Sequence, residues 1–338
     1  MTKPSILQRA IGLVILFISF VGGWVAYDYQ FSLQSKIQLP KEGALFEIAQ
    51  GSSMQKVTEQ LHAQGILKKP LYLLFYARKQ GLGDKIKAGE YRLTADLTYL
   101  SMLDLFVQGK VVEYNLTIVE GWNIHQVLQA LAAEKQLVNS LAQIPISEVM
   151  QKVTGIARHP EGQFLPDTYQ FTKGTSDIHF LKRAFSMKEK VLAQEWKLRA
   201  PNLPLQKPYE ALILASIIEK ETAQQDEYAK VAGVFVRRLQ KGMLLQTDPT
   251  VIYGMGVDYK GNIRRKDLEQ DTAYNTYVHA GLPPTPIAMP GRQAIHAALH
   301  PDDSNALYFV ATGDGGHYFS ATLDEHLRAV RQYQLKRK

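Results

Sequence analysis

The chain has 338 residues, of which 46% are hydrophobic and 21% are charged, the composition of an ordinary globular protein of about two domains. The net charge of +7 is spread along the chain and therefore indicates no particular binding partner. The one dense basic run, residues 336–338, is typical of a solvated tail. The absence of cysteine excludes disulfides, thiol nucleophiles and cysteine metal sites. It is compatible with an extracytoplasmic bacterial protein that avoids oxidation.

The first apolar segment, Ala10 to Tyr27, is 18 residues long and carries no charge. At about 1.5 Å per helical residue it nearly spans a hydrocarbon core of about 30 Å. Lys3 and Arg9 precede it, which favours a cytoplasmic amino terminus. A cleaved signal peptide is the alternative, but no small-residue cleavage site follows the apolar run. We therefore predict a cytoplasmic segment at residues 1–9 and a signal anchor at residues 10–29.

An internal repeat follows a polar linker at residues 30–43. The segment FEIAQG at residues 46–51 recurs as LTIVEG at residues 116–121, and each copy precedes a helix-like spacing of apolar residues. The repeat predicts two units, each with a strand, a glycine turn and a helix. The two units could share one small α+β layer.

The remaining predicted elements have clearer sequence boundaries. The pattern predicts helices at residues 71–78, 99–106, 177–197 and 292–300, and strands at 88–93, 306–311 and 317–320. Residues 127–156 are helical in character, and a final helix ends the chain. The aromatic residues Tyr72, Phe75, Tyr76 and Tyr91 could stack on sugar rings, but their spacing favours a core role.

A constrained loop is predicted at residues 159–169, HPEGQFLPDTY. Two prolines and a glycine exclude regular structure, and loops of this kind often carry functional groups. Its carboxylates, Glu161 and Asp167, are therefore candidate site residues. Asp167 could equally shape the turn.

A buried helix is predicted where the apolar run at residues 211–218 ends at Glu219. Glu219 continues the apolar face, so its pKa should be raised, as a general acid near neutral pH requires. Glu221 lies roughly 200° around the helix, so we expect it to face solvent or cap, and not to share a site with Glu219. The alternative for Glu219 is a structural ion pair with an arginine at residues 237–238.

Other catalytic chemistries are less well supported. Asp248 precedes a proline and is the expected N-cap of a helix at residues 251–254, which is compatible with a site role. No serine lies in a Gly-x-Ser-x-Gly context. His296 and His300 lie four residues apart, but Ala297 replaces the glutamate of the zinc-protease motif and no third ligand is indicated. We expect no metal and no cofactor.

Four segments together resemble one family. ASIIEKET at residues 215–222, LQTDPTVIYGMG at 245–256, AYNTY at 273–277 and GLPP at 281–284 are similar to the endolytic murein transglycosylases of bacteria, the YceG-like family. The resemblance covers nearly the whole chain, including the anchor. It departs at Gln163, Thr285 and Met289, where the family usually has an aromatic residue, glycine and asparagine.

The resemblance implies cleavage of the MurNAc-GlcNAc β-1,4 bond within nascent peptidoglycan strands. No water enters, and the product has a 1,6-anhydro-MurNAc end, which would terminate elongation. Glu219 is the implied catalytic acid and base, and one carboxyl suffices because the sugar's C6 hydroxyl attacks, whereas hydrolysis uses two. We expect further residues to line the glycan cleft: Gln246, Asp248, Tyr274, Asn275, Tyr277, Glu161 and Asp167.

The implied organisation is an α+β protein with a transmembrane helix, a lysin-motif-like module at residues 44–112 and a larger α+β catalytic domain at 113–338. The protein would cross the inner membrane once, with its catalytic domain in the periplasm. Expected partners are peptidoglycan strands, the membrane and peptidoglycan synthases, and no nucleic acid. The alternative function is a non-catalytic glycan-binding scaffold of the cell-wall machinery; a hydrolase would instead give reducing ends.

Overall fold

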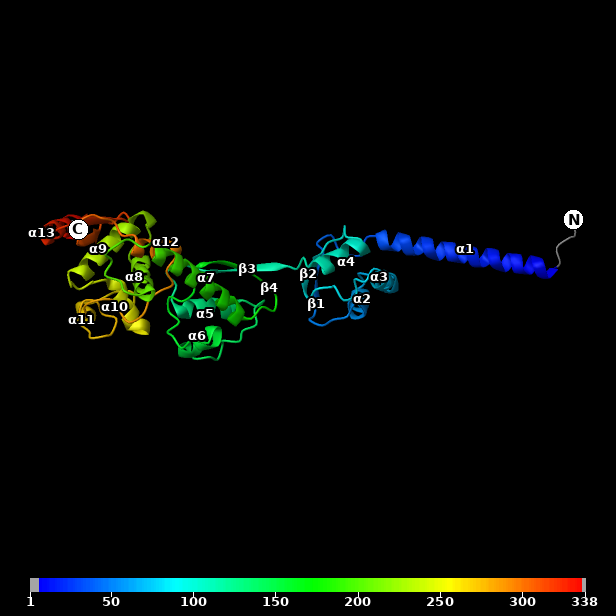
Figure 1. Ribbon diagram of the computed structural model, residues 1–338, viewed down its shortest axis with the longest axis horizontal. Coiled ribbons are helices and arrows are strands. Elements are labelled where there is room, and N and C mark those ends of the chain that lie inside the picture. The colour runs from blue at the N-terminus through cyan, green and yellow to red at the C-terminus, as the bar shows by residue number, and fades with distance from the viewer. Residues whose placement is uncertain (1–5, 336–338) are drawn as a thin grey trace. The chain divides into compact units, whose positions relative to one another are not determined.

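The structure, a computed structural model, describes residues 6–335 (Figure 1). Lys3 and the basic run at residues 336–338 lie outside this range. The chain combines helices with small sheets, so the α+β class is confirmed. It forms two compact units. The first contains the residues through Tyr114 together with Thr172–Gly174, and the second contains Asn115–Phe171 and the chain from Thr175 onward.

The first helix, α1 (Ile6–Gln34), is long and apolar enough to cross a membrane, with a hydropathy of 2.2, although a signal sequence has the same properties. It extends beyond the predicted anchor, so residues 30–34 are helical and the predicted linker is wrong there. The physical reason is packing, because Leu33 is buried. Asp28 accepts a hydrogen bond from the Tyr72 hydroxyl at 2.8 Å, which also fixes this end of α1.

The remainder of the first unit has the order strand, helix, helix, strand, helix. Strands β1 and β2 are antiparallel, and Phe46, Tyr91 and Phe106 pack in the core between them and the helices. The predicted helices and strands are confirmed here, but Phe75 is 59% exposed and is not a core residue. The elements are β1 (Ala44–Ile48), α2 (Met54–Ala63), α3 (Pro70–Lys79), β2 (Gly89–Leu93) and α4 (Tyr99–Gln108).

Both copies of the internal repeat form a strand, a turn and a helix, as predicted. The second copy comprises β3 (Glu113–Ile118) and α5 (Ile124–Ala133). Gly51 and Gly121 occupy equivalent turns with φ of 76° and 75°, a conformation that favours glycine. The expectation of one shared layer is wrong, because β1 pairs with β2 whereas β3 pairs with β4 (Asp167–Thr172).

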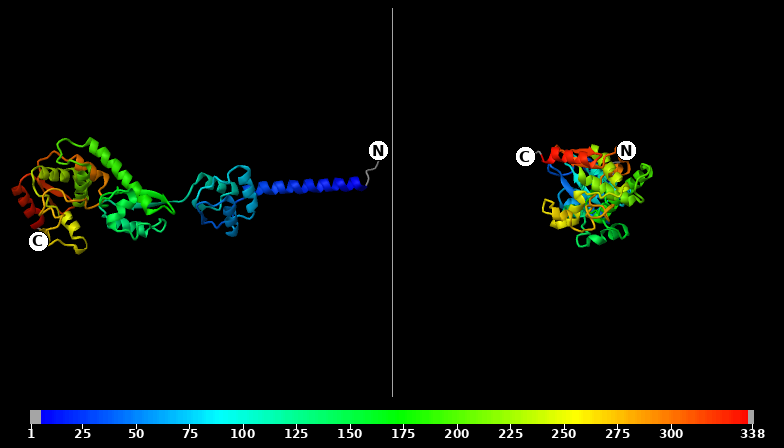
Figure 2. Two further views of the ribbon diagram at one scale, coloured as in Figure 1. Left: turned by 60° about the horizontal axis from the view of Figure 1, so that its bottom comes forward. Right: turned by 90° about the vertical axis from the view of Figure 1, so that its left-hand side faces the viewer.

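The second unit is built around α8 (Pro208–Glu221), which packs against α7, α9, α10 and α12 (Figures 1 and 2). Pro208 suits the first turn of this helix, and all of residues 211–218 are buried. The other elements are α6 (Ile146–Thr154), α7 (Asp177–Leu198), α9 (Tyr228–Gln240), α10 (Asp248–Met255), α11 (Arg265–Leu268), α12 (Arg292–Leu299), β5 (Tyr308–Ala311), β6 (His317–Ser320), α13 (Leu323–Val330), two 3-10 turns (Gln225–Glu227 and Gly256–Asp258) and a π-helical turn (Arg331–Leu335).

The predicted loop at residues 159–169 is irregular only through Pro166. Asp167 starts β4, so the loop prediction is wrong for its last three residues. The strand forms because Tyr169 and Phe171 alternate into the core, a pattern hidden by the prolines before it. Gly162 in the loop has φ of 73° and lies against Pro286.

Candidate active site

The end of α8 places the carboxylate of Glu219 between two hydrogen-bond donors. The Tyr228 hydroxyl donates to Oε1 at 2.9 Å, and the backbone N–H of Gly291 donates to Oε2 at 2.9 Å. Burial raises the pKa of Glu219, and the two hydrogen bonds offset part of that rise. A carboxyl group held in this way stays protonated to a higher pH than an exposed glutamate.

The alternative of a structural ion pair with Arg237 or Arg238 is wrong. Arg237 donates to the Ala306 carbonyl at 2.7 Å and forms an ion pair with Asp302. Arg238 donates to the carbonyls of Leu307 and Leu245. Both guanidinium groups therefore brace loops of the second unit, and Glu219 has neither as a partner.

A pocket of about 350 Å³ surrounds the end of α8. One wall is the Gly121 turn, which is fixed by paired backbone hydrogen bonds: Gly121 N–H donates to Met289, and Met289 N–H donates to Trp122. Glu120, beside this turn, is a carboxylate that the sequence interpretation missed; its position before the repeat's glycine was the available signal. The lining comprises Glu120, Gly121, Glu219, Lys220, Glu221, Thr222, Ala223, Gln225 and Tyr228.

The expectation for Glu221 is wrong. Its side chain is mostly buried, accepts a hydrogen bond from the Thr247 hydroxyl and lines the same pocket as Glu219. Burial raises the pKa of Glu221 to about 7. The two glutamates have different partners, as their separation around the helix requires. Both residues nevertheless line this open pocket at the helix end.

Two larger pockets continue from this one. A pocket of about 530 Å³ shares Glu221 with it, and a pocket of about 770 Å³ shares Gly121 and Lys220 with it. The three pockets therefore adjoin at these shared residues, and Glu219 lines the pocket that has residues in common with both others. We call these adjoining pockets the α8 groove.

Four of the predicted cleft residues line the α8 groove. Gln246, Asp248 and Tyr277 line the 530 Å³ section, where the Tyr277 hydroxyl donates to Asp248 at 2.6 Å. Tyr274 lines the 770 Å³ section, and its hydroxyl is 2.8 Å from that of Thr285. Asp248 is the first residue of α10 and not its N-cap, which is Thr247.

The other three predicted cleft residues do not line the groove. Asn275 is buried, and its amide binds the carbonyls of Leu268 and Gln270, so it fixes a loop. Asp167 is exposed and bonds to the adjacent backbone. Glu161 is fully buried behind the groove wall.

Glu161 joins the loop at residues 159–166 to two other elements. It accepts hydrogen bonds from the N–H of Ile124, at the start of α5, and from the Tyr253 hydroxyl, each at 3.1 Å. Burial raises the pKa of Glu161 from 4.5 to about 7, although both bonds oppose the rise. The folded state therefore holds this proton more tightly than the unfolded chain does.

This pKa shift predicts a pH dependence of stability. Glu161 stabilises the protein most when protonated, and its contribution is lost as the pH rises from about 4.5 through about 7, on the order of 3 kcal/mol in total. Glu161→Gln does not titrate, so its midpoint of thermal unfolding should fall less between pH 5 and pH 8 than that of the wild type. Equal falls in both proteins would contradict the shift.

The structure supplies a third potential metal ligand that the sequence did not indicate. The sequence indicated no third ligand for His296 and His300, but Glu195 of α7 lies beside both. None of these three residues lines the α8 groove.

The chain is similar to known proteins over most of its length. Residues 46–332 match the YceG-like family. A Bacillus subtilis protein named endolytic murein transglycosylase is 30% identical over 93% of this chain and 91% of its own length. A Streptococcus pneumoniae protein of the same name is 27% identical over 95% of this chain and 64% of its own length. The crystal structure of a yceG-like protein from Listeria monocytogenes is 30% identical, covers 86% of this chain and 99% of that one, and has a TM-score of 0.55. The chain belongs to the YceG-like family.

Proposed function

We propose that this chain is a lytic transglycosylase that cleaves the MurNAc-GlcNAc β-1,4 bond within peptidoglycan strands and leaves a 1,6-anhydro-MurNAc end. The observation that carries the proposal is Glu219, a mostly buried carboxyl group with two fixed donors in a pocket that adjoins two larger ones. Family membership and the names of the relatives support the same reaction.

The proposed mechanism uses Glu219 twice. Protonated Glu219 first gives its proton to the glycosidic oxygen as the bond from C1 of MurNAc breaks. The carboxylate then takes the proton of the C6 hydroxyl as that oxygen bonds to C1. Atoms balance without water, and Glu219 ends protonated. Tyr228 and the Gly291 N–H hold the carboxylate in place through both steps.

Hydrolysis is the competing chemistry, because Glu120 and Glu221 share the pocket. A hydrolase would use a second carboxylate to activate water or to attack the sugar. Glu221, whose pKa burial raises to about 7, is able to act as a base near neutral pH, so its presence does not decide between the reactions. We favour transglycosylation because the relatives are named for it, and the products distinguish the two reactions.

Internal cleavage is supported by the position of Glu219 within the groove. Sections of about 530 and 770 Å³ continue from the central pocket, so sugars could bind on both sides of the broken bond. Digestion of purified long glycan strands should give a broad range of shorter strands with anhydro ends at early times. Release of disaccharides alone would contradict internal cleavage, and no cleavage at all would favour the glycan-binding scaffold.

The remaining proposals concern location and organisation. We propose that α1 anchors the chain in the inner membrane once, with the catalytic domain at residues 113–338 in the periplasm and peptidoglycan synthases as partners. The reaction would terminate nascent strands. Residues 44–112 would form a lysin-motif-like module; the order β1, α2, α3, β2 supports this. Protection of the chain from protease in intact spheroplasts would contradict the topology.

The Tyr228 hydroxyl should set the pH range of activity. Its hydrogen bond lowers the pKa of Glu219, so Tyr228→Phe should raise that pKa further. Because the first step needs protonated Glu219, the fall in rate on the alkaline side should move up by about one pH unit. A pH–rate profile measures this, with Tyr318→Phe on the exposed face of β6 as a control. An unmoved alkaline limb in Tyr228→Phe would contradict the assignment.

A further inference from the structure

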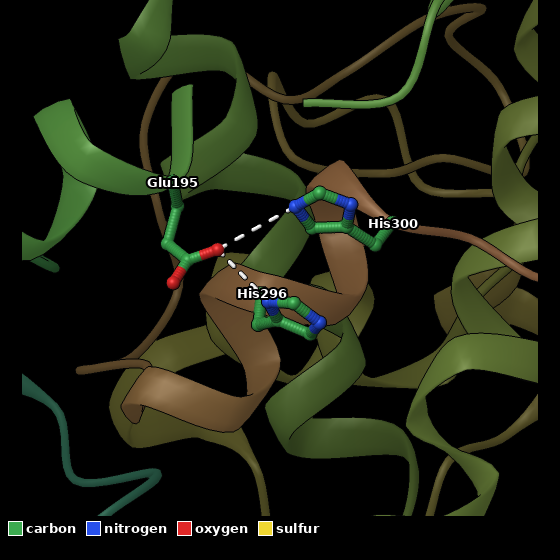
Figure 3. Close-up of side chains that lie close together, drawn as sticks. All are labelled: Glu195, His296 and His300. Atoms are coloured by element: carbon green, nitrogen blue, oxygen red, sulfur yellow. Dashed lines mark hydrogen bonds and ion pairs between the residues drawn. The ribbon is translucent and has the colours of Figure 1, made fainter. Parts of the chain in front are cut away.

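A group of three side chains outside the α8 groove has the composition of a metal site. Glu195, near the end of α7, faces the imidazoles of His296 on α12 and of His300, the C-cap residue of α12 (Figure 3). The potential ligand atoms of the three residues lie within 4.8 Å of one another. Two imidazoles and one carboxylate form a ligand set that zinc sites use.

The two distances from the Glu195 carboxylate to the imidazole nitrogens are near those between ligands of a tetrahedral ion. Glu195 Oε2 is 2.8 Å from His296 Nδ1 and 3.5 Å from His300 Nε2. Ligands at about 2.0–2.2 Å from a tetrahedral ion lie about 3.3–3.6 Å apart. The His300 distance already matches. The His296 distance must open by about half an ångström, and this side chain is 54% exposed and free to adjust.

His300 gives a second indication. Its Nε2 atom is shielded from solvent and makes no hydrogen bond of normal geometry among residues 6–335, because its contact with Glu195 Oε2 is 3.5 Å long. Buried polar atoms normally have partners, so an orphan one requires a reason. The two imidazole rings also stack, with centroids 4.3 Å apart, which turns them toward the same carboxylate.

We propose that Glu195, His296 and His300 bind a divalent transition-metal ion of the zinc class, with the fourth position open to solvent. Imidazole with carboxylate selects such an ion over Mg²⁺ or Ca²⁺, which prefer oxygen ligands alone. The ion connects α7 to α12. Gly291, which donates to Glu219, directly precedes α12, so the ion stabilises the helix that carries this donor.

The test is metal binding by the full chain in detergent, measured by calorimetry and by thermal unfolding with ZnCl₂ or MgCl₂. We expect one zinc ion per chain. At about 100 times the dissociation constant, zinc should raise the unfolding midpoint by about 5–10 °C, and magnesium should have no such effect. His296→Ala and Glu195→Gln should each weaken zinc binding by about 10–100-fold or more. Replacing a residue that only holds a ligand in place already costs about 10–100-fold in metal affinity, and these two residues would bind the ion directly.

The matched control is His279→Ala. His279 is exposed and forms a pair with Asp271 at 2.6 Å, so it has a carboxylate partner, but within residues 6–335 it belongs to no group of three potential ligands. Its replacement should leave zinc binding unchanged. The proposal is overturned if zinc raises the unfolding midpoints of His296→Ala and Glu195→Gln as much as that of the wild type. It is also overturned if His279→Ala abolishes the rise. Unfolding midpoints without metal show whether each variant is folded.

Discussion

Glu219→Gln should lower the rate of glycan-strand cleavage by about 10³-fold or more while leaving the fold intact. Glutamine has nearly the same shape, and its one carbonyl oxygen can accept from the Gly291 N–H while its NH₂ group donates to the Tyr228 hydroxyl oxygen. It cannot donate a proton to the glycosidic oxygen or take one from the C6 hydroxyl. The measurement is the initial rate of release of anhydro-ended products from purified strands.

The matched control for this variant is Glu210→Gln, at the opposite end of the same helix. Glu210 accepts a hydrogen bond from the N–H of Gln206 and caps the start of α8. Its replacement should cost some stability and leave the rate per folded molecule unchanged. If Glu219→Gln is folded and cleaves strands as fast as the wild type, Glu219 is not the catalytic acid.

Gly162→Ala should cause a large loss of stability, about 2–5 kcal/mol. Gly162 has φ of 73°, which disfavours any residue with a Cβ, and an added Cβ would lie 2.5 Å from the Pro286 ring. The proline cannot rotate away, so the loop that carries Glu161 must move. Thermal unfolding of the second unit should show a midpoint lower by about 5–15 °C.

Gly155→Ala separates the cost of the positive φ from the cost of the contact with Pro286. Gly155 ends α6 with φ of 76°, but an added Cβ there would meet nothing within 4 Å. Gly155→Ala should therefore lower the free energy of unfolding only by the cost of a positive φ for alanine, about 1–2 kcal/mol. The difference between the two variants reports the contact with Pro286. Equal losses would show that this contact contributes nothing.

The sequence predicted the central helix and its acid because both depend on local patterns. An apolar run without glycine or proline indicates a buried helix, and Glu219 follows on the same face. Helix geometry also gave Glu221 a different direction from Glu219. It could not show that the chain around Thr247 folds over that side of the helix and buries Glu221 as well.

Local sequence patterns could not predict contacts between residues that lie far apart in the sequence. Glu195 is about a hundred positions from His296, so no spacing connected it to the histidines. Asn275 lies in a family motif with Tyr274 and Tyr277, but motif order does not show which side chain binds the loop backbone and which faces the groove. The strand at Asp167 was hidden because prolines and glycine dominate the local pattern.

The central claim is that one carboxyl group cleaves the strand without water, and cleavage in H₂¹⁸O tests it most directly. Mass spectrometry of the products from wild type should show anhydro-MurNAc ends with no ¹⁸O, and Glu219→Gln should give no products above background. Reducing ends that carry ¹⁸O would contradict the account, because they would require water activated by a second carboxylate such as Glu120 or Glu221.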